Sequence, residues 1–165
     1  MEHKPVRFNG MSFALRGEKN RFVLPAMFRK DVVTASNGER LLGVTKHHAW
    51  TCLSGFGLSR ADNFDVLVEK EATRQTALGK DFDADAYAHS LHGYAEVPFD
   101  PSGRFVMPDY LSDAAKLGSE LFLHGAGDNF TLWNPEELYA MGPMFDGAKA
   151  ACRRMQAEAH AGKKK

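Results

Sequence analysis

An internal repeat constrains the fold of this chain more than any other feature of its sequence. Residues 21–25, Arg-Phe-Val-Leu-Pro, align without a gap with residues 104–108, Arg-Phe-Val-Met-Pro, which lie 83 positions later. The match resumes downstream at an offset of 80, in two stretches: 41–44 with 121–124, and 50–53 with 130–133. Because a repeated sequence predicts a repeated structural unit, we expect each copy to contain a strand, a tight turn, a strand ending in proline, a short helix and two further strands.

The second copy carries the clearest turn signal. Asp100 can bond the backbone two residues on, the proline after it presets the next φ, and Gly103 can adopt a left-handed conformation. This pattern predicts a type I turn that closes a hairpin between 96–99 and 104–107. The Gly-rich stretch 125–129 lies between two β-prone runs and predicts another hairpin, of 121–123 with 130–133.

Helices are expected between and after the copies. Phe64, Leu67 and Val68 have helical spacing, and a second helix is predicted from Asp83 to His92. The C-terminal stretch carries a stripe of small and apolar residues at steps of three and four, which predicts an amphipathic helix docked on the domain or on another subunit. We therefore divide the chain into a first repeat (6–60), a helical linker (61–93), a second repeat (94–143) and a C-terminal helix with a basic tail (144–165).

The charge is neutral in sum but uneven along the chain. The 21 basic and 21 acidic side chains cancel, which excludes a uniformly basic nucleic-acid binder. Residues 1–60, however, carry ten basic and four acidic side chains, whereas residues 61–143 carry five basic and fifteen acidic ones. A basic segment raises the local concentration of polyanions even on a neutral protein, although solvated surfaces also vary in sign by chance.

Other classes of protein find little support in the sequence. Cys52 and Cys152 are too far apart to indicate a disulfide framework, and neither a membrane span nor a secretory leader is evident, so we expect a cytoplasmic protein. The pair His47-His48 with Cys52 lacks a fourth metal ligand, and adjacent histidines on a strand would point to opposite faces. The repeat alignment places both histidines in the turn between two hairpin strands, which favours a plain loop. The Gly-rich stretches are not followed by a phosphate-binding lysine. We expect no enzyme activity, cofactor, metal or small-molecule substrate.

These residues together resemble a known family. Two copies of a basic turn followed by a strand ending in proline, with a downstream Gly-rich turn, Phe130, Trp133 and an Asn-Pro-Glu-Glu helix start, are similar to the MraZ transcriptional regulators. Each copy of that family is of the AbrB/SpoVT swapped-hairpin type, and the resemblance covers roughly residues 6–143. The first copy departs from the family's Asp-x-Lys-Gly-Arg turn, because 17–21 reads Gly-Glu-Lys-Asn-Arg and lacks the aspartate.

The resemblance implies a fold and a mode of action. The expected fold is mainly β with peripheral helices (α+β): an intramolecular pseudo-twofold swapped-hairpin β-barrel. Its subunits would assemble into a ring-like homo-oligomer, associated with the nucleoid, that binds double-stranded DNA at short direct repeats upstream of the division and cell-wall gene cluster. The family's motif assigns DNA contact to Lys19, Arg21 and Arg104.

The residues themselves refine this assignment. Arg7, Arg16, Arg29 and Lys30 add to the basic cluster of the first copy, so we expect Lys19, Arg21, Arg16 and Arg7 to make most of the DNA contacts. Arg104 follows Asp100 by four residues across a turn, which favours a structural ion pair. Asp100, Gly103 and Asn20 are expected to shape the turns. The alternative is a non-catalytic, antitoxin-like interaction module of the same swapped-hairpin type that has lost DNA binding.

Overall fold

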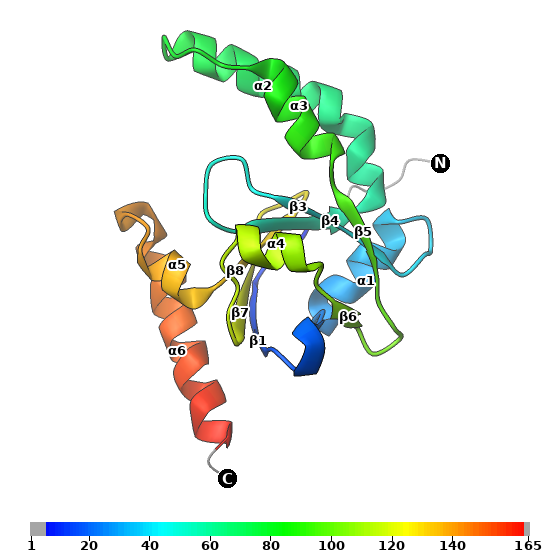
Figure 1. Cartoon of the computed structure of the whole chain (residues 1–165), viewed down its shortest axis with the longest axis vertical. Coiled ribbons are helices and arrows are strands. Elements are labelled where there is room, and N and C mark those ends of the chain that lie inside the picture. Colours follow the sequence, from blue (N-terminus) through cyan, green and yellow to red (C-terminus); the bar gives the residue numbers. More distant parts are fainter. Residues whose placement is uncertain (1–5, 164–165) are drawn as a thin grey trace.

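The computed structural model describes residues 6–163 and contains the same series of elements twice (Figure 1). The first copy consists of β1 (Met11–Leu15), a 3-10 turn η1 (Glu18–Asn20), β2 (Arg21–Val23), α1 (Ala26–Ala35), β3 (Leu41–Lys46) and β4 (Leu53–Gly57). The second consists of β5 (Ala95–Pro98), β6 (Arg104–Val106), α4 (Asp109–Ala114), β7 (Glu120–Gly125) and β8 (Phe130–Trp133). The order of elements expected from the repeat is therefore confirmed.

The two copies exchange strands. The larger sheet has the order β1-β7-β8-β4-β3-β5, and the smaller sheet pairs β2 with β6, all antiparallel. The first strand of each copy thus pairs with the other copy, β1 with β7 and β5 with β3. The same is true of β2 and β6, so the arrangement has the pseudo-twofold relation expected of swapped hairpins.

This exchange corrects one local expectation. The hairpin of β7 with β8 is confirmed, but the predicted hairpin between 96–99 and 104–107 is wrong in its pairing. The chain does reverse there, because the Gly103 N–H donates to the Asp100 carbonyl at 2.8 Å. The strands on either side of the turn then separate, since their ladder partners β3 and β2 come from the first copy. Turn chemistry fixes the reversal of the chain, whereas burial of the apolar face selects the partner strands.

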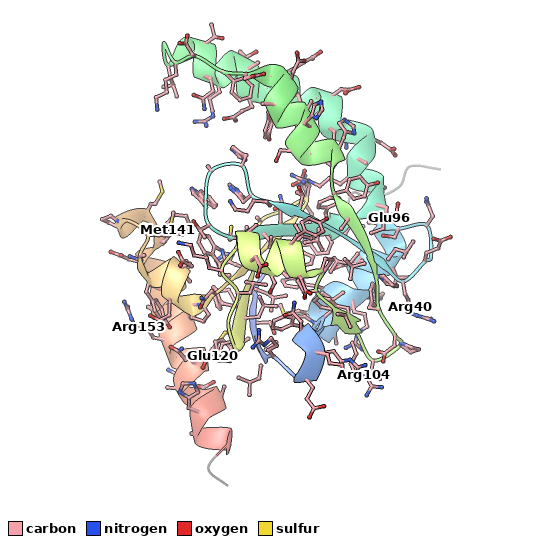
Figure 2. The ribbon with its side chains drawn as sticks, in the orientation of Figure 1. Arg40, Glu96, Arg104, Glu120, Met141 and Arg153 are labelled. Carbon is pink, nitrogen blue, oxygen red and sulfur yellow. The ribbon has the colours of Figure 1, made fainter. Side chains whose placement is uncertain are left out.

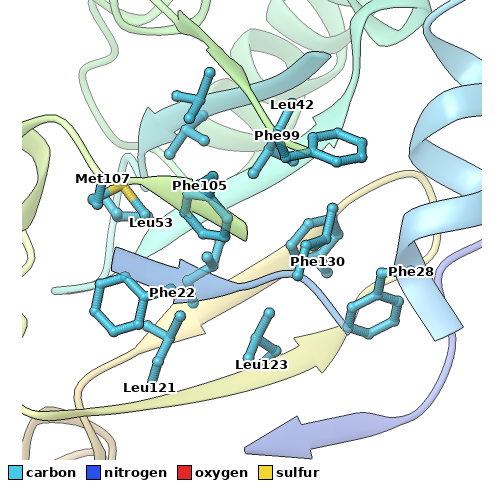
Figure 3. Packing of buried hydrophobic residues seen from close by; sticks show 14 of the residues in the cluster. Phe22, Phe28, Leu42, Leu53, Phe99, Phe105, Met107, Leu121, Leu123 and Phe130 are labelled. Carbon is cyan, nitrogen blue, oxygen red and sulfur yellow. The ribbon is translucent and has the colours of Figure 1, made fainter. Parts of the chain in front are cut away.

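The main core lies where the two copies meet. Phe22 and Phe105 face each other between β2 and β6 with ring centroids 6.1 Å apart, and both are buried (Figure 3). Phe28 of α1 stacks on Phe130 of β8 at 4.7 Å. Neither copy could bury these rings alone, because a two-stranded ribbon needs a partner surface.

Helices make up more of the structure than expected. Among residues 6–163, helices hold more residues than strands do, so the architecture is mixed α+β rather than mainly β. After η2 (Leu58–Asn63), α2 (Phe64–Ala77) and α3 (Ala84–His92) form an antiparallel pair that extends above the sheets in Figure 1. Asp83 caps α3 by accepting the Ala86 N–H at 3.0 Å, and Phe64 and Leu91 pack against Phe56 of β4.

The C-terminal elements cover another part of the large sheet. They are α5 (Pro135–Tyr139), η3 (Pro143–Phe145) and α6 (Asp146–Lys163), and α6 runs down the left of Figure 1. Cys152 of α6 and Leu138 of α5 pack with Trp133 and with Cys52, whose thiol is free. Of the basic tail, residues 164–165 lie outside the described residues. Between residues 6 and 163, no helix combines the length and apolar character needed to cross a bilayer.

Candidate nucleic-acid interface

The ribbon formed by β2 and β6 has one buried and one exposed face. Successive side chains of a strand point to opposite faces, so Phe22 and Phe105 enter the core. The residues on either side of them, Arg21, Val23, Arg104 and Val106, are exposed. We call these four residues the ribbon face. Arg21 lies opposite Val106 and Val23 opposite Arg104, so the two arginines occupy diagonal positions about 7–8 Å apart.

The loop before β6 is closely organised around Asp100. One carboxylate oxygen accepts the N–H groups of Ser102 and Arg104, each at 2.9 Å, and the other accepts the Arg104 Nε at 2.8 Å. The Arg104 backbone N–H, followed by its guanidinium, lowers the pKa of the Asp100 carboxyl. Arg104 is therefore held in one orientation while its terminal guanidinium nitrogens stay free of this ion pair. In Figure 2 it lies at the lower edge of the molecule, well separated from Arg153.

Gly103 allows the two copies to approach at this loop. Its φ is +88°, and a Cβ added there would lie 2.4 Å from the Leu24 carbonyl oxygen of the first copy. The Leu24 N–H donates to the Gly103 carbonyl at 2.7 Å. A side chain at this position would therefore push apart the end of β2 and the loop before β6.

The loop before β2 reaches a similar shape with other residues. The Gly17 N–H donates to the Arg21 carbonyl at 2.7 Å, as the Asp100 N–H does to Arg104 at 3.0 Å. Lys19 and Asn20 both have left-handed backbones, with φ of 56° and 60°. The Asn20 amide donates to the Met107 carbonyl at 2.9 Å and accepts the Ser112 hydroxyl at 3.3 Å. Asn20 thus takes the place that Gly103 has in the other copy.

The basic side chains of the first loop have no fixed acidic partner. Lys19, Arg21 and Arg16 are all exposed, and among residues 6–163 none of the three forms an ion pair. Arg16 and Lys19 line an open hollow of about 640 Å³, shared with Glu18, Asp109 and Asp113. The surface at this end of the ribbon is therefore mixed in charge, with the cations exposed.

Two other arginines of the predicted basic cluster lie elsewhere. Arg7 is exposed beside Gly127 in the β7–β8 turn. Eight residues lie between it and Arg16, and the five of them that form β1 alone span roughly 17 Å of strand. Arg29 of α1 is half-buried, and its guanidinium donates to the carbonyls of Leu24 at 3.1 Å and Pro101 at 3.5 Å. Arg29 thus stabilises the loop before β6 in the other copy, a role that its position in the sequence did not indicate.

The histidines considered as metal ligands form an aromatic turn instead. His47 and His48 lie in the turn between β3 and β4, as the repeat alignment predicted, and their rings stack on each other at 4.6 Å. Burial raises the pKa of the Cys52 thiol to about 12. Within the described residues, no group of three or more His, Cys, Asp or Glu side chains is arranged to hold a metal ion.

Fold and surface together define a class of protein: two interlocked swapped-hairpin repeats that expose a short arginine-bearing β-ribbon with a basic loop. Comparison with known proteins agrees. The chain is 32% identical over 121 residues to a transcriptional regulator MraZ of Leuconostoc mesenteroides, covering 72% of this chain and 74% of that protein. It is 29% identical over 143 residues to the regulator of the same name from Hydrogenovibrio crunogenus, covering 86% and 89%.

A third such regulator, from Rhodospirillum rubrum, is 29% identical over 125 residues, or 74% of this chain and 76% of that protein. No family model matches the chain. On these similarities the protein belongs to the family of MraZ transcriptional regulators, whose members are regulators and not enzymes.

Proposed function

We propose that this protein regulates transcription by binding specific duplex DNA with the ribbon face and the two loops beside it. The observation that carries this proposal is the placement of Arg21 and Arg104, one from each copy, on the exposed side of a two-stranded ribbon. The major groove of B-DNA admits such a ribbon, and arginine can bind guanine or phosphate with two parallel hydrogen bonds.

The basic residues have different parts in this proposal. Lys19 and Arg21 contact DNA directly, because they are exposed and free of acidic partners in the described chain. Arg104 reaches the same groove in the orientation set by Asp100. Arg16 adds a phosphate contact near the first loop. Arg7, at the other end of β1, contacts only the DNA backbone outside the ribbon.

Assembly and target follow from the family resemblance. In this proposal the strands of the two repeats close into a barrel, with a linker at 61–93 between repeats at 6–60 and 94–143 and a C-terminal segment at 144–165. Subunits form a ring in the cytoplasm at the nucleoid and bind short direct repeats upstream of the division and cell-wall gene cluster. A ring that presents the same loop repeatedly suits sites spaced by one helical turn, about 10 bp, and converts weak contacts into avidity.

The test removes the two unpaired cations of the first loop. In a gel-shift titration with DNA from upstream of the protein's own gene, we expect Lys19→Ala with Arg21→Ala to abolish retention, while the oligomer keeps its size in gel filtration. In each single variant, which loses one phosphate contact, the slope of log K against log[salt] should become shallower by about 0.9. The same titration, on duplexes that carry one or two of the direct repeats, measures how much the second repeat increases affinity.

The matched control removes two exposed lysines from the α2 region, Lys70→Ala with Lys80→Ala, and should leave retention unchanged. Equal binding by the first-loop variant and the unaltered protein would refute the contact assignment. A well-assembled protein that retains no upstream duplex would favour the antitoxin-like interaction module.

A further inference from the structure

Two valines share the ribbon face with the arginines. The side chains of Val23 and Val106 are 44% and 50% exposed, whereas the other apolar residues of these strands, Phe22 and Phe105, are buried. Each valine lies directly opposite an arginine of the other copy. The ribbon face therefore carries two repeat-related pairs, each with one cationic and one apolar side chain.

The spacing between the arginine and the valine of the same strand matches the base-pair spacing of DNA. Two residues along a strand advance about 6.6 Å, and two base-pair steps advance about 6.8 Å. A strand of three residues, about 10 Å long, spans roughly three base pairs. If the ribbon lies along the groove, the arginine and the valine of one strand face bases two steps apart.

Resting on the proposed DNA-binding function, we infer that Val23 and Val106 determine specificity by contacting the C5-methyl groups of thymines in the major groove. Thymine is the base that presents a methyl group there. An aliphatic side chain can neither bind phosphate nor form hydrogen bonds with base edges, so a methyl group is the partner for which it is chemically suited. The arginine on the same strand supplies the polar contact two base pairs away.

A second explanation makes a different prediction. Valine suits an exposed strand position because β-branched residues favour extended backbone. On that explanation the two valines serve only the ribbon, and removing methyl groups from the DNA leaves binding unchanged.

The experiment replaces each thymine of the upstream duplex in turn with deoxyuridine, which lacks the methyl group, and measures affinity by fluorescence anisotropy. We expect at least one thymine for each valine whose replacement weakens binding about fourfold, the factor that corresponds to ~0.8 kcal/mol for one buried methyl group. In Val23→Ala the sensitivity at one of these positions should disappear, and in Val106→Ala the sensitivity at the other.

The matched control is Val66→Ala, because Val66 is a valine of similar exposure, 47%, on α2; it should keep both sensitivities. Val23→Thr retains a β-branched side chain with one methyl group, so its sensitivity to deoxyuridine should be reduced but not lost. Because threonine also favours extended backbone, this variant distinguishes loss of the methyl contact from disruption of the strand. Unchanged binding to every deoxyuridine duplex, or equal sensitivity in all variants, would overturn the inference while the Arg21-dependent retention still supports the proposed function. Failure of the unaltered protein to bind any upstream duplex would overturn both.

Discussion

The two loops that flank the ribbon face differ most in consequence at one position, which is Asp100 in the second loop and Gly17 in the first. Asp100 fixes the loop before β6 through two backbone N–H groups and the Arg104 guanidinium, and position 17 of the other loop is glycine. The reversal before β2 still forms, because the Gly17 N–H bonds the Arg21 carbonyl and Asn20 bonds the second copy. What the first loop lacks is an acceptor that orients its arginine. The Arg104 side chain is therefore held by Asp100, whereas the Arg21 side chain has no ion-pair partner among residues 6–163.

Restoring the carboxylate should stabilise the first loop. Gly17 has φ of −86° and ψ of −170°, a conformation open to any residue, and an added Cβ would lie 3.7 Å from the Arg21 carbonyl oxygen, an ordinary contact. We expect Gly17→Asp to gain about 0.5–1 kcal/mol in the free energy of unfolding over Gly17→Ala, measured with urea at pH 7. A carboxyl whose folded pKa is lowered stabilises above its unfolded pKa of about 3.9. The gain should therefore vanish as the pH falls through the lowered folded value, and a gain that persists at pH 2 would contradict this explanation.

Among the elements, the β3–β4 turn is built on a neutral histidine. The His47 ring stacks on Trp50 at 4.3 Å, and its Nδ1 accepts the N–H groups of Ala49 and Trp50, both at 3.1 Å. Burial first, then His48, Lys46 and Arg60, lower the pKa of His47 to about 4. The turn thus depends on an unprotonated His47 nitrogen close to the half-buried Lys46 ammonium group, which donates to the carbonyls of His47 and Trp50.

This turn should make the protein sensitive to mild acid. In the unfolded chain His47 binds a proton with a pKa of about 6.5, and in the folded chain it does so only near pH 4. Between these values the unfolded state binds more protons, so stability falls as the pH drops from 6.5 to 4 and then levels off. His47→Asn keeps an acceptor for the turn and removes the titration. Its urea midpoint should fall less than that of the unaltered protein between pH 7 and pH 4.5, and equal slopes would contradict the role of His47.

At the scale of the whole molecule, the exchange of strands makes the two copies one folding unit. Phe22 of the first copy packs on Phe105 of the second, and the smaller sheet consists of one strand from each copy. A substitution in the core of one copy should therefore lower the stability of both copies together. We expect Phe22→Ala to lower the free energy of unfolding by about 3–5 kcal/mol, in a single transition that is the same by tryptophan fluorescence and by circular dichroism. Two separate transitions would contradict the interlocked arrangement.

Much of the local structure could be predicted from the sequence, because its signals are local. The helix that begins near Asp83, the turn at 100–103 and the β7–β8 hairpin each depend on a few neighbouring residues. Strand partners depend on burial across the whole chain, so the local turn signal predicted the wrong partner for β6, and only the family resemblance indicated the exchange. The candidate site was predictable in part. Arg21 and Arg104 do share a surface. Arg7 lies close to Arg16 in sequence but apart from it in space, and nothing in the sequence around Arg29 indicated that it would bond the carbonyls of Leu24 and Pro101.

The strand order also has a consequence for synthesis. β1 and β3 of the first copy pair with β7 and β5 of the second copy, which are synthesised later. β3 keeps an open edge until its partner ends at Pro98, and β1 until its partner ends at Gly125. Open edges favour pairing with other nascent chains. Long-range pairing of this kind also slows folding. The helices α2 and α3 are translated in that interval. They can bury Phe56 of the first copy before the strands of the second copy are made.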